Sequence, residues 1–131
     1  MLIILSVGLL FVAALVSGAV WMAARFVHQS NLARAADAAY MIADEVGYLL
    51  EENPEASEAE IREIMVHLVD ASVIHLRRDA EGQVVDPWGH RFVVTWERGV
   101  AAPAVTCVSR GADGLLGTAD DISYPPPAGA R

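Results

Sequence analysis

The chain begins with a long apolar segment. No Asp, Glu, Lys or Arg occurs from Met1 to Ala24, and as a helix at about 1.5 Å per residue this segment is roughly 36 Å long. Because the hydrocarbon core of a bilayer is about 30 Å thick, we expect a transmembrane anchor. A cleaved signal peptide and a buried core helix are the alternatives. Small residues suit cleavage at Val16-Ser17-Gly18-Ala19, but the basic n-region is missing, and the length favours the anchor.

An apolar stripe extends the helical pattern beyond this anchor. Its members recur at three- and four-residue spacing, which is typical of a helix with one buried face. Asn53-Pro54 should end the helix, because the residue before a proline is pushed out of the α region. We therefore expect one helix to run from the bilayer into the domain. The stripe consists of Leu32, Ala35, Ala36, Ala39, Ile42, Ala43, Val46 and Leu50.

A second, shorter helix is predicted after Asn53-Pro54. Ser57 is a good N-cap residue and Glu60 follows three positions later, which is the pattern of a capping box. An apolar face follows, and we expect it to pack on the first helix. This face consists of Ile61, Ile64, Met65, Leu68 and Val69.

The half of the chain after Ser72 has short apolar-polar alternations separated by turn residues, which predicts strands and loops. Arg91 to Trp96 and Ala104 to Ser109 should form an antiparallel hairpin, with Ala101-Ala102-Pro103 in the connection. Tyr124 to Arg131 should be an extended or disordered tail. The fold class is therefore α+β, with a transmembrane helix over 1–24, an extracytoplasmic domain over 25–124 and a flexible tail over 125–131.

The charge of the chain limits its partners. A net charge of −8 argues against nucleic-acid binding, which needs clustered cations. An acidic run between Asp44 and Glu63 contains only one basic residue, Arg62. This run predicts a solvated face, with a docking surface for a basic partner as the alternative. Cys107 is the only cysteine, so no intramolecular disulfide can form, and we expect it to be buried.

Catalytic patterns are missing from the sequence. The four histidines have no metal-ligand spacing, and no nucleophile elbow or phosphate loop occurs. We expect no catalytic residues, no organic cofactor and no small-molecule substrate. His90 stands near Asp86 in a turn before a strand, which explains both residues without catalysis. The histidines are His28, His67, His75 and His90.

The segment from Gly111 to Ile122 is the candidate for metal chemistry. It has three carboxylates and three glycines that permit tight turns, and it contains no cationic residue. Carboxylates brought together in a folded loop repel one another, and a divalent cation removes that cost. Ca²⁺ fits best, because it accepts six to eight oxygen ligands in flexible geometry. The EF-hand pattern does not fit. The alternative is an exposed Asp-Gly turn with solvated carboxylates.

Two motifs at this end of the chain carry a family resemblance. Asp86-Pro87-Trp88-Gly89 is followed by a strand, then by Ser109-Arg110-Gly111-Ala112-Asp113-Gly114 and Asp120-Asp121-Ile122. Together they resemble the major pseudopilin of type II secretion. That family has a long N-terminal helix, a short helix, a small antiparallel sheet and a C-terminal calcium loop. The resemblance implies side-chain ligands for Ca²⁺ at Asp113, Asp120 and Asp121 and backbone carbonyl ligands at Arg110 and Leu115.

The N-terminus departs from that family. A pseudopilin normally has a short basic leader, a glycine cleavage site, a phenylalanine, and a glutamate five residues into the mature chain. Here Gly8 is followed by Leu9, and the fifth residue after Gly8 is Ala13. Two interpretations stay open, a misplaced or truncated start and a divergent relative without standard processing.

The resemblance implies a structural role in a pseudopilus at the bacterial inner membrane. The partners would be membrane lipid, further copies of the chain or other pseudopilins, and secretion-apparatus proteins. Arg25 and Arg34 after the apolar segment favour a cytoplasmic C-terminus by the positive-inside rule. We expect the periplasm instead, because an acidic segment follows and the loop suits a calcium-rich compartment. The alternative function is a non-assembling, membrane-tethered calcium-binding module that recognises another protein.

Overall fold

The computed structural model describes residues 2–71, 73–97 and 102–127, with the backbone alone for residues 2–11. The chain has an α+β fold with a long N-terminal helix, a short second helix and small antiparallel sheets. It divides into two compact units, Met1–Asn31 and Leu32–Arg131. Helix α1 (Leu2–Glu52) contributes residues to both. One continuous helix, as the apolar periodicity predicts, is therefore confirmed.

All the described residues of the first unit belong to helix α1. Its described side chains are largely apolar and exposed, and its large apolar side chains range from Val27 at 56% to Phe26 at 74%. The Arg25 guanidinium lies 5.4 Å from the centre of the Trp21 ring, which is a cation–π distance. Within the part of the chain that the structure describes, no helix combines the length and hydropathy needed to cross a membrane.

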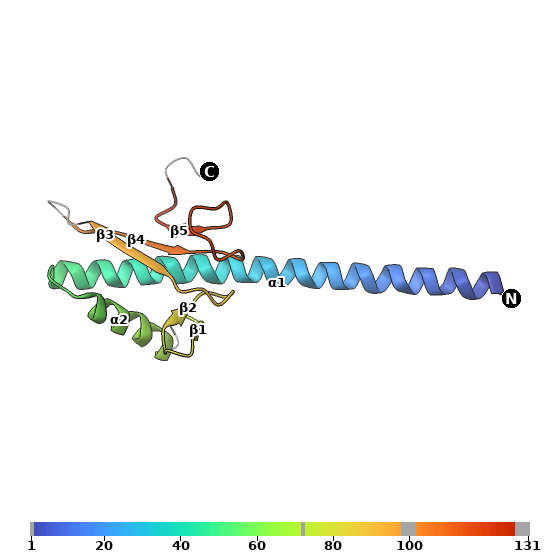
Figure 1. The fold of residues 1–131 in the computed structure, drawn as a ribbon, viewed down its shortest axis with the longest axis horizontal. Coiled ribbons are helices and arrows are strands. Elements are labelled where there is room, and N and C mark those ends of the chain that lie inside the picture. Colours follow the sequence, from blue (N-terminus) through green and yellow to red (C-terminus); the bar gives the residue numbers. More distant parts are fainter. Residues whose placement is uncertain (1, 72, 98–101, 128–131) are drawn as a thin grey trace. The chain divides into compact units, whose positions relative to one another are not determined.

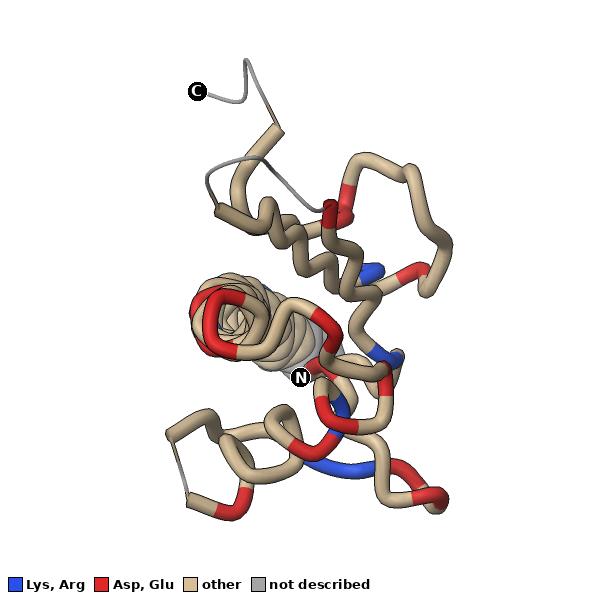
Figure 2. The backbone as a smooth tube through the Cα atoms, turned by 90° about the vertical axis from the view of Figure 1, so that its left-hand side faces the viewer, with Lys and Arg blue, Asp and Glu red and all other residues tan. Residues whose placement is uncertain are grey.

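The second unit is built around the C-terminal half of α1. In Figures 1 and 2 this half lies between the β3–β4–β5 sheet on one side and α2 with β1 and β2 on the other. Two layers cover it, and its buried face is shifted relative to the predicted stripe. Ala38 is buried although the stripe leaves it out, and Ala36, a predicted member, is exposed. The buried positions are Ala35, Ala38, Ala39, Ile42, Ala43, Val46 and Leu50.

Helix α2 (Glu58–Asp70) begins at the predicted capping box. The Ser57 hydroxyl accepts from the Glu60 amide at 3.3 Å, and a Glu60 carboxylate oxygen accepts from the Ser57 amide at 2.7 Å. Helix α1 ends at Glu52, directly before Asn53-Pro54. The apolar face of α2 packs into the same core as α1. Ile61, Met65 and Leu68 are buried, while Ile64 and Val69 are half-buried.

The strands form two antiparallel sheets. β1 (Arg77–Arg78) pairs with β2 (Val84–Val85), and β3 (Val93–Glu97), β4 (Ala104–Ser109) and β5 (Ile122–Tyr124) form the second sheet in that order. The predicted β3–β4 hairpin is confirmed. Its first strand starts at Val93 rather than Arg91, because Arg91 forms an isolated bridge with Val85 instead. Of the predicted connection, Ala101 lies outside the described residues.

The inclusion of Tyr124 in the predicted extended or disordered tail is wrong, although the predicted domain boundary keeps this residue inside the domain. Tyr124 belongs to β5 and pairs with Cys107 in the sheet. The strand stops there because Pro125 has no backbone N–H to donate to a neighbour. Residues 128–131, the end of the predicted tail, lie outside the described residues. Cys107 is fully buried under this sheet, as expected for a small apolar side chain.

Candidate metal centre

The two strands that flank the candidate loop pair with each other in the sheet. Ser109, the last residue of β4, pairs with Ile122, the first residue of β5, so Arg110 to Asp121 form one connection between paired strands. Gly111 has a φ of 60°, and a Cβ at this position would collide with the carbonyl and carboxylate of Asp120. The two ends of the loop therefore approach each other more closely than any residue except glycine allows.

The Thr118 hydroxyl is the point where oxygen atoms of the loop converge. Its Oγ1 lies 2.7 Å from Asp120 Oδ1, 3.2 Å from the Leu115 carbonyl oxygen and 3.3 Å from Asp113 Oδ1. A hydroxyl has one proton, so it can donate to only one of these three acceptors at a time. The other two acceptor oxygens then face the lone pairs of the Thr118 hydroxyl oxygen instead of a proton. Three of the five predicted ligands, Asp113, Leu115 and Asp120, thus lie around one group that cannot satisfy them all.

Asp120 is held ionised within this cluster. The Thr118 hydroxyl, and after it the amide of Asp113, which donates to Asp120 Oδ2 at 3.0 Å, lower the pKa of Asp120 to about 2. Hydrogen bonds to a carboxylate favour its charged form. The Asp113 carboxylate accepts from the Leu115 amide at 2.8 Å. Residues 111–121 contain no Lys, Arg or His, and Arg110 at the start of the loop is its only cationic residue.

Asp121 and Arg110, the other two predicted ligands, are engaged elsewhere in the loop. Asp121 Oδ2 accepts from the Gly117 amide at 2.6 Å, and the Arg110 carbonyl accepts from the Gly114 amide at 3.2 Å. The second oxygen of Asp121, Oδ1, is buried, and nothing in the described part of the chain donates a hydrogen bond to it. A buried carboxylate oxygen without a partner is energetically costly.

The loop contains the kinds of oxygen donor that a hard divalent cation prefers. It offers carboxylate oxygens, a hydroxyl and backbone carbonyls, with one buried carboxylate oxygen unpartnered, and these are the ligands that Ca²⁺ prefers. Over the described ranges, no group of three or more His, Cys, Asp or Glu side chains is gathered so that it could hold a metal ion. The three aspartates therefore do not all meet at one point. Asp113 and Asp120 share Thr118, and Asp121 lies beside Gly117.

Sequence reasoning missed the residues that organise this loop. Thr118 was assigned no role, although a hydroxyl two positions before an aspartate is well placed to donate to it. Asp86 is buried, with Oδ2 2.7 Å from the Ser109 hydroxyl. The His90 ring nitrogen Nδ1 lies 3.0 Å from the Gly111 carbonyl oxygen. Asp86 and Ser109 both stand in the motifs of the family resemblance, which is the signal that could have found them.

Comparison with known proteins finds no match to a family model, to a curated protein or to a solved structure.

Proposed function

We propose that this chain is a membrane-anchored, pseudopilin-like structural subunit of a type II secretion-like pseudopilus, and that its C-terminal loop binds Ca²⁺. The observation that carries the proposal is the convergence of Asp113, Asp120 and the Leu115 carbonyl on a hydroxyl with a single proton. A bound Ca²⁺ would supply the positive charge that this oxygen cluster lacks.

Five residues of the loop provide the proposed ligands for Ca²⁺. Asp113, Asp120 and Asp121, with the carbonyls of Arg110 and Leu115, are the proposed ligands. Because the loop joins β4 to β5, fixing its shape also fixes the edge strand of the sheet. An ordered sheet edge gives each subunit a constant surface for contacts with its neighbours.

The order of elements supports the structural role. A long helix, a short helix, a small antiparallel sheet and a C-terminal loop follow one another as in the pseudopilins that the sequence resembles. The apolar segment from Met1 to Ala24 serves as the anchor in the bacterial inner membrane, and the domain lies in the periplasm. The partners in this proposal are membrane lipid, further copies of the chain or other pseudopilins, and proteins of the secretion apparatus.

Thermal melting of the full chain in detergent tests the calcium site. At a Ca²⁺ concentration 100 times the Kd, binding to the folded form alone stabilises it by about 2.7 kcal/mol. For a domain of this size, that corresponds to a rise in Tm on the order of 10 °C. We expect this rise with Ca²⁺, a smaller one with Mg²⁺, and none in chelator. Circular dichroism at 222 nm and tryptophan fluorescence report the transition.

Single substitutions assign the effect to the loop. Asp113→Asn and Asp121→Asn should each remove most of the calcium-dependent rise, because each replaces a charged oxygen ligand by an amide. The matched control is Asp37→Asn, which removes an exposed carboxylate on α1 and should keep the full rise. Equal melting of the parent with and without Ca²⁺, or equal loss in the control, would contradict the calcium site.

The second candidate function is a non-assembling, membrane-tethered calcium-binding module that docks a basic partner. It is favoured by the acidic run at the end of α1 and the start of α2, whose carboxylates are exposed; Figure 2 shows the acidic positions at the end of α1 in red. A groove of about 640 Å³ between α1 and the β4–β5 side of the sheet is lined in part by Asp44, Glu45 and Tyr48. Crosslinking between copies discriminates between the two functions, as argued below.

A further inference from the structure

A buried carboxylate lies under the candidate loop. Asp86 is 1% exposed. Its Oδ1 accepts from the amides of Trp88 at 3.1 Å and His90 at 2.9 Å, and its Oδ2 accepts from the Ser109 hydroxyl at 2.7 Å. A buried carboxylate is costly unless hydrogen bonds compensate for the lost water. With three donors it instead fixes the turn from Asp86 to His90 against the end of β4.

Ser109 transmits this anchoring to the loop. Its hydroxyl donates to Asp86 and accepts from the Gly111 amide at 3.3 Å. Ser109 is also fully buried and is the last residue of β4 before the loop. The Ser109 side chain therefore holds the first turn of the loop, and Asp86 sets the orientation of that side chain.

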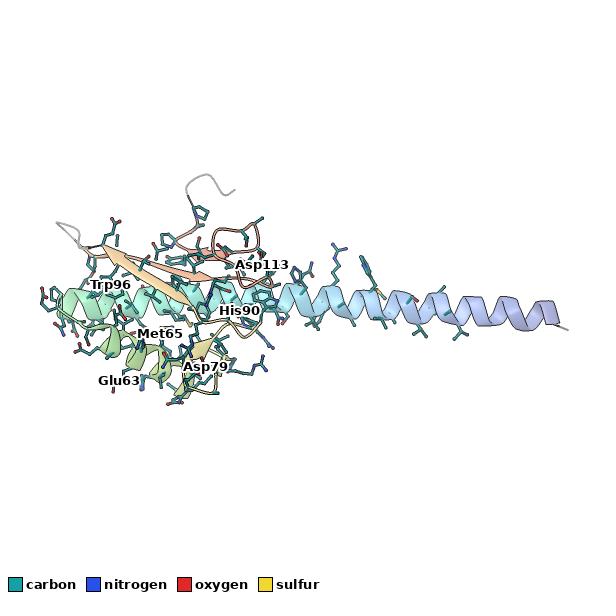
Figure 3. The ribbon with its side chains drawn as sticks, viewed as in Figure 1. Glu63, Met65, Asp79, His90, Trp96 and Asp113 are labelled. Carbon is teal, nitrogen blue, oxygen red and sulfur yellow. The ribbon has the colours of Figure 1, made fainter. Side chains whose placement is uncertain are left out.

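His90 forms a second link to the same turn. Its ring nitrogen Nδ1 lies 3.0 Å from the Gly111 carbonyl oxygen, and because a carbonyl only accepts, Nδ1 must carry the proton of this bond. The ring also packs under Gly114, where a Cβ would come within 2.6 Å of His90 Nε2 and where φ is 71°. Figure 3 shows His90 and Asp113 at the same end of the sheet.

We propose that Asp86, Ser109 and His90 are positioning residues that hold the first turn of the loop, at Gly111 and Gly114, and so place Asp113 for ion binding before an ion arrives. The inference rests on the proposed calcium site. Held at both Gly111 and Gly114, the turn that precedes and follows Asp113 is already ordered, so binding loses less conformational entropy. Partners outside the ligand set that orient metal ligands typically change affinity by 10- to 100-fold when they are removed.

The sharpest test compares two replacements of His90. His90→Phe keeps a ring beside Gly114 but removes the donor to the Gly111 carbonyl. His90→Asn keeps a donor near the position of Nδ1. We expect His90→Phe to weaken Ca²⁺ binding roughly 10-fold or more, and His90→Asn to stay within about threefold of the parent. The Kd is measured by calorimetric titration of CaCl₂ into the full chain in detergent. His67→Phe, at an exposed position on α2, is the matched control and should not change the Kd.

Hydrogen exchange of the loop amides gives a second measurement that needs no metal. In chelator, Asp86→Asn and His90→Phe should speed exchange in residues 110–121 and leave the β3–β4 ladder unchanged. Asp86→Asn turns one of two acceptor oxygens into an NH₂ group that only donates, so either the Ser109 hydroxyl or the backbone amides at Asp86 Oδ1 lose their acceptor. A role in overall stability alone would instead lower the Tm and speed exchange in both segments, without changing the Kd of the folded protein, and this would overturn the proposal.

The two measurements separate the inference from the function on which it rests. If the parent binds no Ca²⁺ but both variants loosen the loop, the calcium function fails and the positioning role stands. If the parent binds Ca²⁺ and His90→Phe binds it equally well with unchanged loop exchange, the positioning role is wrong and the calcium function stands. If the parent binds no Ca²⁺ and loop exchange is also unchanged, both are overturned.

Discussion

At the scale of single residues, burial strongly perturbs the Cys107 thiol. Burial raises the pKa of its thiol from an ordinary value of 9.0 to about 12. Burial disfavours the charged thiolate, and the side chain is fully enclosed beneath the sheet. The residue is therefore a packing element, and thiol reagents should reach it only after unfolding.

The raised thiol pKa predicts a stability loss in alkali. Between about pH 9 and pH 12 the folded state keeps a proton that the unfolded state has lost, so the free energy of unfolding falls as pH rises, by up to about 1.4 kcal/mol per pH unit. Below pH 8 this contribution is complete and constant. In Cys107→Ala the difference from the parent should therefore be constant below pH 8 and shrink above pH 9. Urea titrations at pH 7, 8, 9.5 and 10.5 measure it, and parallel profiles at all four pH values would contradict the assignment.

The same scale explains which site residues sequence could predict. The sequence singles out the candidate ligands Asp113, Asp120 and Asp121 because they are close together in the chain and nothing cationic separates them. The residues that support the loop were not predicted, because Asp86 contacts Ser109 across 23 positions of the sequence and His90 contacts Gly111 across 21. Those contacts depend on the register of the paired strands, and although the sequence predicts the β3–β4 hairpin, it does not specify which residues stand opposite one another.

At the scale of elements, local sequence signals predicted the bounds of the helices, whereas long-range pairing determined the bounds of the strands. The end of α1 at Glu52 and the capping box at Ser57 depend on neighbouring residues, so both were predicted correctly. β5 has only three residues and was missed, because a strand that short owes its existence to the ladder with β4. Tyr124 was included in the predicted tail because prolines follow it. A proline ends a strand, however, and does not prevent the residues before it from forming one.

A contact between aromatic rings fastens β5 to helix α1. The rings of Tyr40 and Tyr124 have centroids 4.8 Å apart at 85°, an edge-to-face arrangement. Such pairs contribute about 0.5–1.5 kcal/mol beyond the area they bury. Because Tyr124 lies three residues after Asp121, this contact also fixes the C-terminal end of the candidate loop.

A double-mutant cycle should detect this contact. Tyr40→Ala and Tyr124→Ala should each destabilise the fold, and the double variant should lose about 0.5–1.5 kcal/mol less than the sum of the single losses. Urea unfolding of the full chain in detergent measures the free energies. Phe26, which is 74% exposed on the same helix, provides the control cycle with Tyr124 and should show additive losses. Additivity in the Tyr40–Tyr124 cycle would mean that the rings do not stabilise β5.

At the scale of the whole molecule, the two units expose different chemistry. The described side chains of the first unit are mostly apolar and more than half exposed, whereas the second unit buries its apolar residues in one core. Large exposed apolar surfaces mark contacts with a membrane or with other proteins. The proposed function assigns the first unit to both, with lipid around the anchor and neighbouring anchors packed against it.

Crosslinking between anchors distinguishes an assembling subunit from a tethered module. Helices in membranes pack closely where small residues recur every four positions, and Ala14 and Gly18 have this spacing. In a Cys107→Ala background, Ala14→Cys should form disulfide-linked dimers when membranes are oxidised, with a yield that persists when expression is lowered severalfold. Glu63→Cys, exposed on α2, is the matched control for random collisions and should stay monomeric on a non-reducing gel. If Ala14→Cys crosslinks no more than Glu63→Cys, the anchors do not pack together, and the tethered calcium-binding module becomes the better description of this chain.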